Sequence, residues 1–388
     1  MIRAGLVSIL LLVATEAVLA TASVDGEKSA WPTAMASADR EETLQDSHDT
    51  LEVKKLPYKR PLGFISDIVE AFNDYDTTYI EPNHYNFATM AQGTMSFERY
   101  QLLSSSGQSV TFMPDNSFRI GPYFGWRWIF MGYTFDLKHF GFGGKSGRHD
   151  FDFSIYTALF GIDLYWRNSN NDYNLREVRL PSQGSVMRLR KVPFTGISVG
   201  VKGLTTYYIF NHQHFSYPAA YNQSTCQRRS AGSLMVGLGY TDHSLDFSHE
   251  KLDSLLSQKE IGERIDSGLY FNNLRYVDIA AYVGYSYNWV FARNWLFNAT
   301  LSVGLAYNYS KGVYEHDNFI TGLRNFSFNN FYFDAYGRFG LVWNNSKWFA
   351  GFSAIVHNFN YRKPSFRVMN VFGNINVYAG FNFGRRKK

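Results

Sequence analysis

The sequence predicts an all-β protein, a transmembrane antiparallel up-and-down β-barrel of about twelve strands. Three observations predict it. Long segments alternate between apolar and polar residues, aromatic residues make up 18% of the chain, and the mean hydropathy is only −0.26. A barrel strand shows one face to lipid and the other to the lumen, so its apolar residues are diluted by polar ones.

The clearest alternation lies in a hairpin from Val277 to Tyr309. One face of its two arms is apolar and ends in Trp and Tyr, and the other face is polar except for Leu296. Each arm exceeds the usual soluble strand of about five or six residues. The arms match the roughly 9–11 residues with which a tilted strand crosses a bilayer. We therefore expect Val283 and Leu301 to face lipid.

Twelve such segments follow one another, the even number expected of a bacterial single-chain barrel. They lie near residues 85–103, 117–126, 128–137, 150–157, 159–168, 196–209, 231–246, 275–290, 294–309, 327–343, 347–360 and 366–383. Their joins alternate between tight periplasmic turns and long outer loops, as is typical of such barrels. Two joins break this rule: 210–230 is long on the periplasmic side, and 361–366 is short on the outer side.

Tryptophans gather at the tight joins. Indole rings prefer the membrane–water boundary, where both the apolar ring and the N–H group are satisfied. The predicted aromatic girdle comprises Trp126, Trp128, Trp289, Trp295, Trp343 and Trp348.

The N-terminal part differs from the barrel. Residues 1–22 read as a signal peptide, with Arg3 before a short apolar core and small residues at the cleavage site. Residues 23–74 read as a disordered leader that ends in a short amphipathic helix over Gly63–Phe72. Residues 75–388 form the predicted barrel, so the expected location is the bacterial outer membrane after signal cleavage.

The polar faces carry charges of both signs, which we expect to line the lumen. An unpaired charge in a narrow interior is costly, so they should pair across the barrel. Two interpretations remain open: a cross-braced, mostly filled interior, or a charged constriction that selects solutes. The lumen residues are Arg119, Arg127, Asp152, Asp163, Arg167, Lys202, Asp278, Asp334 and Arg338.

Three short motifs suggest chemistry but have simpler explanations. Ser198, in a nucleophile-elbow pattern, lies within a predicted strand rather than at a strand-to-helix turn. The Gly144–Ser146 loop lacks the earlier glycine of a phosphate-binding loop. His212 and His214 supply only two of the four ligands of a structural zinc site, and no nearby residues complete the set. We therefore predict no catalytic, cofactor or metal residues. Phe215–Ser224, within the 210–230 join, instead suggest an inturned loop or a partner contact.

Four stretches resemble a Bacteroidetes family, the domain-of-unknown-function 4421 family. They are YDTTYIEPNHYNF at 75–87, IGPYFGWRWIFMGYTFDLK at 120–138, FDFSIYTALFGIDLYWRNSNNDYNLR at 151–176 and YYIFNHQHFSYPAAYNQSTCQRRSAGS at 207–233. The resemblance runs from about residue 75 to the C-terminus and implies an outer-membrane or envelope barrel. It implies no activity. Unlike most barrels, this chain continues past its last aromatic residue, Phe383.

The sequence thus favours an outer-membrane barrel that is structural or a passive small-solute pore, without enzymatic activity. One alternative is a surface barrel that binds a ligand through its outer loops, among them the basic loop 169–195. The other is a hydrolase at the outer rim. The expected partners are outer-membrane lipid, lipopolysaccharide and the barrel-assembly machinery. No clustered basic surface points to nucleic acid.

Overall fold

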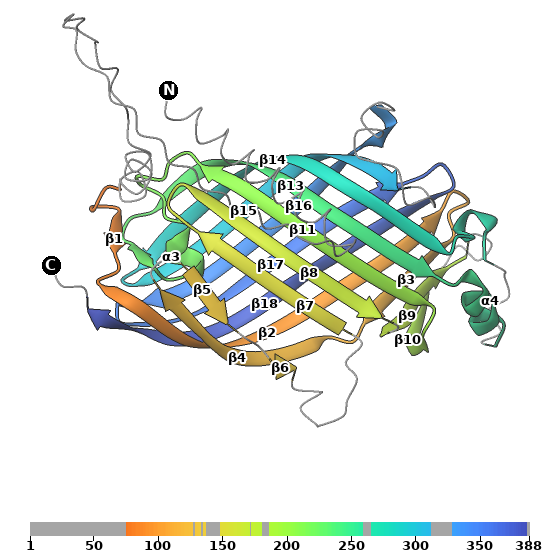
Figure 1. Cartoon of the computed structure of the whole chain (residues 1–388), viewed down its shortest axis with the longest axis horizontal. Helices are drawn as coiled ribbons and strands as arrows, with labels where there is room; N and C mark the ends of the chain where they lie inside the picture. The colour runs from red at the N-terminus through yellow and green to blue at the C-terminus, as the bar shows by residue number, and fades with distance from the viewer. Residues whose placement is uncertain are drawn as a thin grey trace, which may run out of the picture. The chain divides into compact units, whose positions relative to one another are not determined.

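The computed structural model describes residues 75–126, 129–132, 135–136, 148–170, 172–180, 186–258, 265–311 and 328–385. These residues form a barrel of antiparallel strands (Figure 1). The predicted signal peptide, leader and amphipathic helix lie outside the described residues, as do Arg127, Trp128 and the 144–146 loop.

The barrel is one sheet whose strands follow chain order. β2 pairs with the last strand, β18, on one side and with β4 on the other, while β5 and β6 both pair with β4 as one interrupted strand. The strands are β2 (Tyr85–Ser104), β4 (Ser117–Trp126), β5 (Ile129–Gly132), β6 (Phe135–Asp136), β7 (Arg148–Tyr156), β8 (Phe160–Asn170), β11 (Ile197–Ile209), β13 (Ala231–Phe247), β14 (Asn273–Ala292), β15 (Trp295–Lys311), β16 (Phe331–Asn344), β17 (Trp348–Arg362) and β18 (Phe366–Arg385). Within the described ranges, the twelve predicted strands are confirmed.

The thinnest contact in this ring lies between β5 and β7. Among the described residues, the two strands share one backbone pair, Ile129 with Ile155. By contrast, β14 and β15 pair along almost their whole length.

The exterior carries an apolar band, as predicted. Leu301 is 65% exposed and Val283 48%, so both face away from the barrel interior. Trp289, Trp295 and Trp348 are also exposed next to tight joins, and Trp343 is half-buried. On a barrel exterior, such a band is the surface that contacts lipid.

We expect Leu301→Arg to destabilise the folded barrel in lipid vesicles by about 2–4 kcal/mol, because a charge near the bilayer midplane is poorly solvated. Phe291→Arg, next to the β14–β15 turn, should cost only about 0–1 kcal/mol, as for a charge near the interface. Denaturant unfolding followed by tryptophan fluorescence measures both values. Equal losses would contradict a lipid-facing band centred near Leu301.

The end of the barrel that carries the long joins, here the loop end, has an apolar interior. β3 (Ser109–Pro114), β9 (Tyr173–Arg179), β10 (Val186–Phe194), α4 (His249–Gln258) and η3 (Ser267–Leu269) lie there; η4 (Phe328–Asn330) precedes β16. The buried cluster includes Tyr100, Phe112, Leu175, Phe194, Val199, Val201, Phe247, Leu252, Tyr276 and Phe366. At the loop end, apolar side chains therefore point into the barrel and polar side chains point outward, which is the reverse of their arrangement in the apolar band.

The outward face of β13 shows where this reversal begins. Leu234, Val236 and Leu238 are exposed on its outer face, followed on the same face by Asp242 and Asp246. Beyond the apolar band the exterior meets water, so polar residues face out and apolar residues fill the interior.

Candidate binding chamber

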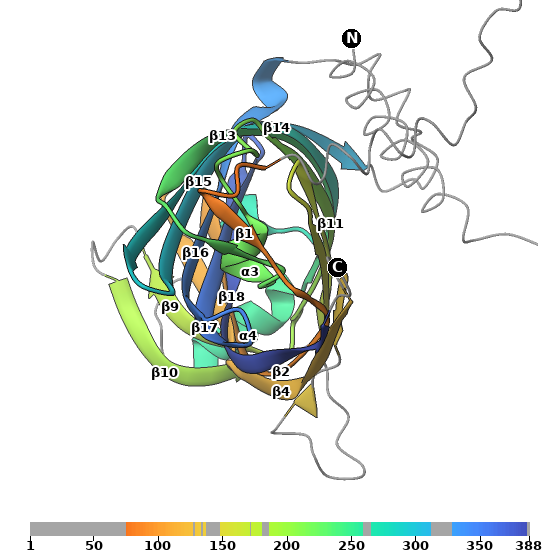
Figure 2. The same ribbon diagram turned by 90° about the vertical axis from the view of Figure 1, so that its left-hand side faces the viewer.

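Residues 210–230, here the inturned segment, fold back into the barrel at the turn end, which carries the tight joins. Its short helix α3 (Pro218–Tyr221) lies inside the ring of strands (Figure 2). Phe215 and Tyr217 are fully buried there. The predicted inturned loop is therefore confirmed, and it occupies part of the lumen.

The polar face of the central hairpin binds the inturned segment. The Tyr221 hydroxyl donates to Asn298 Oδ1 (2.6 Å), and Asn288 Nδ2 donates to the Ser216 carbonyl oxygen (2.7 Å). Leu296, the apolar exception on that face, packs in a cluster with the alanines of α3. The hairpin's inner face is thus complementary to a piece of the chain rather than to water.

A two-stranded sheet covers the turn end. It pairs β1 (Ile80–Pro82) with β12 (Thr225–Gln227), and both views show it at the same end of the barrel (Figures 1 and 2). Arg228 forms an ion pair with Glu81 and donates to Asn294 Oδ1 in the β14–β15 turn (2.9 Å). Burial raises the pKa of the nearby Cys226 thiol, which lies 3.8 Å from the Ser346 hydroxyl.

His214, one of the two histidines considered for a zinc site, serves this packing. His214 Nδ1 lies 3.1 Å from Asn211 Oδ1, and its ring meets Tyr79 edge-on. In the described ranges, no group of three or more His, Cys, Asp or Glu side chains is placed to hold a metal ion.

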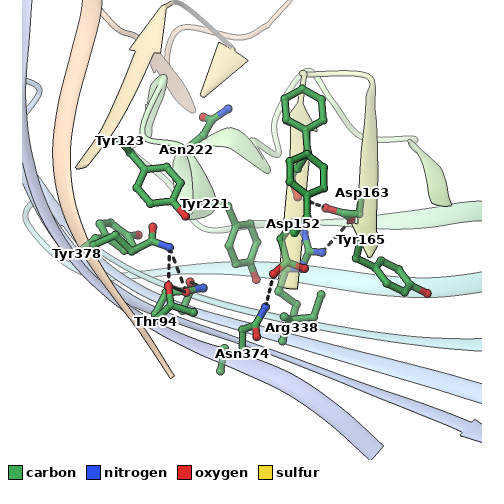
Figure 3. A pocket seen from close by; sticks show the side chains of 18 of the residues that line it. Thr94, Tyr123, Asp152, Asp163, Tyr165, Tyr221, Asn222, Arg338, Asn374 and Tyr378 are labelled. Carbon is green, nitrogen blue, oxygen red and sulfur yellow. Dashed lines mark hydrogen bonds and ion pairs between the residues drawn. The ribbon is translucent and has the colours of Figure 1, made fainter. Parts of the chain in front are cut away.

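A cavity of about 690 Å³ lies inside the barrel and is lined in part by Tyr221 and Asn222 of the inturned segment. We call it the chamber. Its volume lies within the range of small-molecule sites. Figure 3 shows side chains of several strands facing one another across it; the polar and aromatic members include Gln92, Thr94, Arg119, Tyr123, Asp152, Asp163, Arg167, Arg338, Asn374, Asn376 and Tyr378.

One brace across the chamber joins β16 to β8. Arg338 Nη2 donates to Asp163 Oδ2 at 2.8 Å, and both side chains are buried (Figure 3). Asp163 also accepts from the Ser154 hydroxyl (2.6 Å). The Arg338 guanidinium lies within 6 Å of the ring centres of Tyr156, Tyr217 and Tyr221. This one cation therefore connects the barrel wall to the inturned segment.

A second group joins β18 to β7 and β8. Arg167 Nη2 donates to Asn374 Oδ1 (2.9 Å), and Asn374 Nδ2 donates to Asp152 (3.0 Å). Arg167 lies 3.7 Å from Asp152, and Arg119 donates to the Ser96 hydroxyl (2.8 Å). The structure thus brings together five of the predicted lumen charges: Arg119, Asp152, Asp163, Arg167 and Arg338.

The prediction for Lys202 is wrong. Its side chain is exposed on the outer face of β11, over the Trp166 ring at 5.3 Å. Lys202 pairs with Asp242, where the apolar band ends. A lysine at that boundary extends its ammonium group into water while its stem packs on apolar surface. Ser198 likewise lies on the outer face of β11, because its neighbours Ile197 and Val199 are buried.

Asp278 and Asp334 face inward, as predicted, but do not line the chamber. Both are buried: Asp278 lies 3.3 Å from His243 Nε2, and Asp334 accepts from the Asn360 backbone N–H. The sequence missed the neutral part of the chamber wall. The amide side chains of this wall, Gln92, Asn374 and Asn376, lie at polar positions of predicted strands. Nothing in the sequence distinguishes them from ordinary lumen residues.

The family profile described as "Domain of unknown function (DUF4421)" matches residues 74–383. The chain belongs to the DUF4421 family. Comparison with curated proteins found no match. The match spans the whole DUF4421 barrel, including its inturned segment and chamber.

Solved structures similar to the DUF4421 barrel include outer-membrane proteins. The P. putida toluene transporter TodX is 10% identical, with 78% of this chain and 91% of that chain covered and a TM-score of 0.26. OprG from Pseudomonas aeruginosa is 10% identical, with 78% and 98% covered and a TM-score of 0.24. The translocator domain of NalP from Neisseria meningitidis is 11% identical, with 83% and 95% covered and a TM-score of 0.28.

The helices of the DUF4421 barrel are short. Within the described ranges, none has the length and hydropathy of a membrane-spanning helix.

Proposed function

We propose that this chain is a bacterial outer-membrane β-barrel that binds a small solute in a chamber whose lumen is closed at both ends, rather than an open diffusion pore. The apolar band and its flanking tryptophans support the membrane location. The chamber, which is lined by Tyr221 of the inturned segment and by Phe372 of the loop-end cluster, is the observation that carries the proposal.

Both ends of the lumen support the closed state. At the loop end, Phe112, Phe194 and Phe247 pack on one another inside the barrel. At the turn end, the inturned segment is held by hydrogen bonds to several strands, including Gln223 Nε2 to the Tyr378 hydroxyl (3.0 Å) and Asn344 Nδ2 to Gln223 Oε1 (3.1 Å). A continuous water path through such packing would have to displace buried side chains.

We expect the purified protein to give no steady ionic current in planar lipid bilayers at moderate voltage, because both ends of the lumen are filled. Single-channel recording measures this, with a general porin reconstituted in the same way as the positive control. A steady, voltage-independent conductance from every inserted barrel would contradict the closed chamber.

We propose no catalytic role. Ser198 lies within β11, where it pairs with Asp246 of β13, and not at the strand-to-helix turn that exposes a catalytic serine. In the basic loop 169–195, Arg188 lies 3.7 Å from Glu177, and Lys191 forms an ion pair with Asp115. These contacts are consistent with an ordinary protein surface, which leaves the chamber as the better-supported site.

A further inference from the structure

Two arginines lie directly opposite each other on the outer face of the barrel at the loop end. Arg362 is the last residue of β17, Arg367 is the second residue of β18, and the register of these strands pairs the two. Their neighbours Tyr361 and Phe366 are buried in the loop-end cluster, so both arginine side chains face outward. Like charges directly opposite each other on one face of a sheet destabilise it, so this pair requires an explanation.

The protein does not neutralise these charges. Among the described residues, no carboxylate lies within ion-pair distance of Arg362, Arg367 or Lys363, the lysine in the turn between them. We call these three residues the basic tip. Arg99, on the outer face of the neighbouring strand β2, differs in this respect, because its guanidinium forms an ion pair with Glu177 at 2.9 Å.

A tight turn keeps the basic tip near the strand ends. The join between β17 and β18 comprises residues 363–365, and the Lys363 backbone N–H donates to the Phe366 carbonyl oxygen (2.7 Å). This is the short outer join that breaks the usual rule of join lengths. A long loop could carry its charges well away from the membrane surface, whereas so short a turn cannot.

A groove of about 330 Å³ lies where the basic tip meets the apolar band. Its lining includes Phe333, Asn360, Arg362 and Arg367, which belong to three neighbouring strands. Phe333 is 77% exposed and pairs in register with Leu305, an exposed residue of the apolar band. The barrel exterior therefore presents apolar side chains on the membrane side of this groove and guanidinium groups on the water side.

From this arrangement we infer that the groove binds the phosphate group of a lipid in the outer leaflet, with the lipid's acyl chains against Phe333 and Leu305. Long joins lie on the extracellular side of such barrels, so the loop end faces that leaflet. Guanidinium groups bind phosphate oxygens through paired, charge-assisted hydrogen bonds. Basic residues at the edge of a membrane-facing surface attract anionic headgroups.

The lipid that fits is a phosphorylated, acylated sugar, the chemistry of the membrane-embedded part of lipopolysaccharide. This inference rests on the membrane location in the proposed function, but not on the chamber.

Native mass spectrometry of the detergent-solubilised full chain tests the inference, with diphosphorylated lipid A as the probe. The chain should bind this lipid at least about tenfold more tightly than the same lipid without its phosphates. Inorganic phosphate at the same concentration should not displace lipid A, because it has no acyl chains to contact the apolar band. Displacement would overturn the assignment to a lipid and would indicate a site for free anions.

Variants locate the site. The double variant Arg362→Gln/Arg367→Gln should weaken lipid A binding at least about tenfold. If it does not fold, as judged by heat-dependent gel mobility, Arg362→Gln alone keeps the test decisive, because this exposed residue should also be required for binding. Arg99→Gln is the matched control: it removes an outward-facing arginine whose charge is already paired with Glu177, so binding should be unchanged.

Three results would overturn the inference: equal binding of lipid A with and without its phosphates, unchanged binding in the folded arginine variants, or equal weakening in Arg99→Gln. Each would leave the membrane location standing, because the apolar band does not depend on these arginines. A chain that stays monodisperse in buffer without detergent would instead remove the membrane location and, with it, the proposed function.

Discussion

An Arg338→Leu variant is expected to lose about 3–5 kcal/mol in its free energy of unfolding, because it leaves the buried Asp163 carboxylate without its counter-charge. The loss includes the contacts of the guanidinium with Tyr156 and Tyr221, so the inturned segment is loosened as well. Denaturant unfolding in lipid vesicles, followed by tryptophan fluorescence, measures the change.

The matched control is Arg99→Leu, which breaks the half-exposed ion pair with Glu177. Exposed pairs contribute about 0–1 kcal/mol, so this variant should unfold nearly like the wild type. The double variant Arg338→Leu/Asp163→Leu should recover much of the loss, because it removes both charges together. If Arg338→Leu and Arg99→Leu lose the same free energy of unfolding, the Arg338–Asp163 brace does not behave as a buried ion pair.

A Phe112→Ala variant is expected to lose about 3–5 kcal/mol in its free energy of unfolding, the usual range for removing a fully buried aromatic ring from a packed core. Phe112 is fully buried in the loop-end cluster, stacked on Phe194 with ring centres 5.0 Å apart and edge-on to Phe247 at 6.0 Å. The same unfolding measurement applies.

Phe328→Ala provides the control, since Phe328 is 80% exposed in η4 and its removal leaves no cavity. We expect a change of at most about 0.5 kcal/mol there. A small loss in both variants would mean that the loop end is loosely packed. The lumen would then be open on that side, against the closed chamber.

Much of the barrel was predictable from alternation alone. A side chain's face follows from its position along a strand, so Val283 and Leu301 could be assigned to one exterior face without knowing their neighbours. The same rule placed Arg119, Asp163 and Arg338 inside. It could not show that Arg338 meets Asp163, because that contact joins strands 175 residues apart in the chain.

The alternation rule failed where the solvent outside the barrel changes. Alternation identifies two faces of a strand, but which one points inward depends on whether lipid or water lies outside. Lys202 and Ser198 belong to the stretch in which the buried face is the apolar one, and a local pattern carries no information about membrane depth. Leu296 looked like an exception for a related reason, since its apolar partners belong to the inturned segment.

By itself, the sequence determined the strands, their number, their connections and the lipid-facing band, because these follow from local alternation and join lengths. Only the tertiary structure decided that residues 210–230 fill the turn end, that aromatic rings fill the loop end, and that Arg338 meets Asp163 between them. The physical reason is that burial and charge pairing inside a barrel depend on which distant segments meet across the lumen.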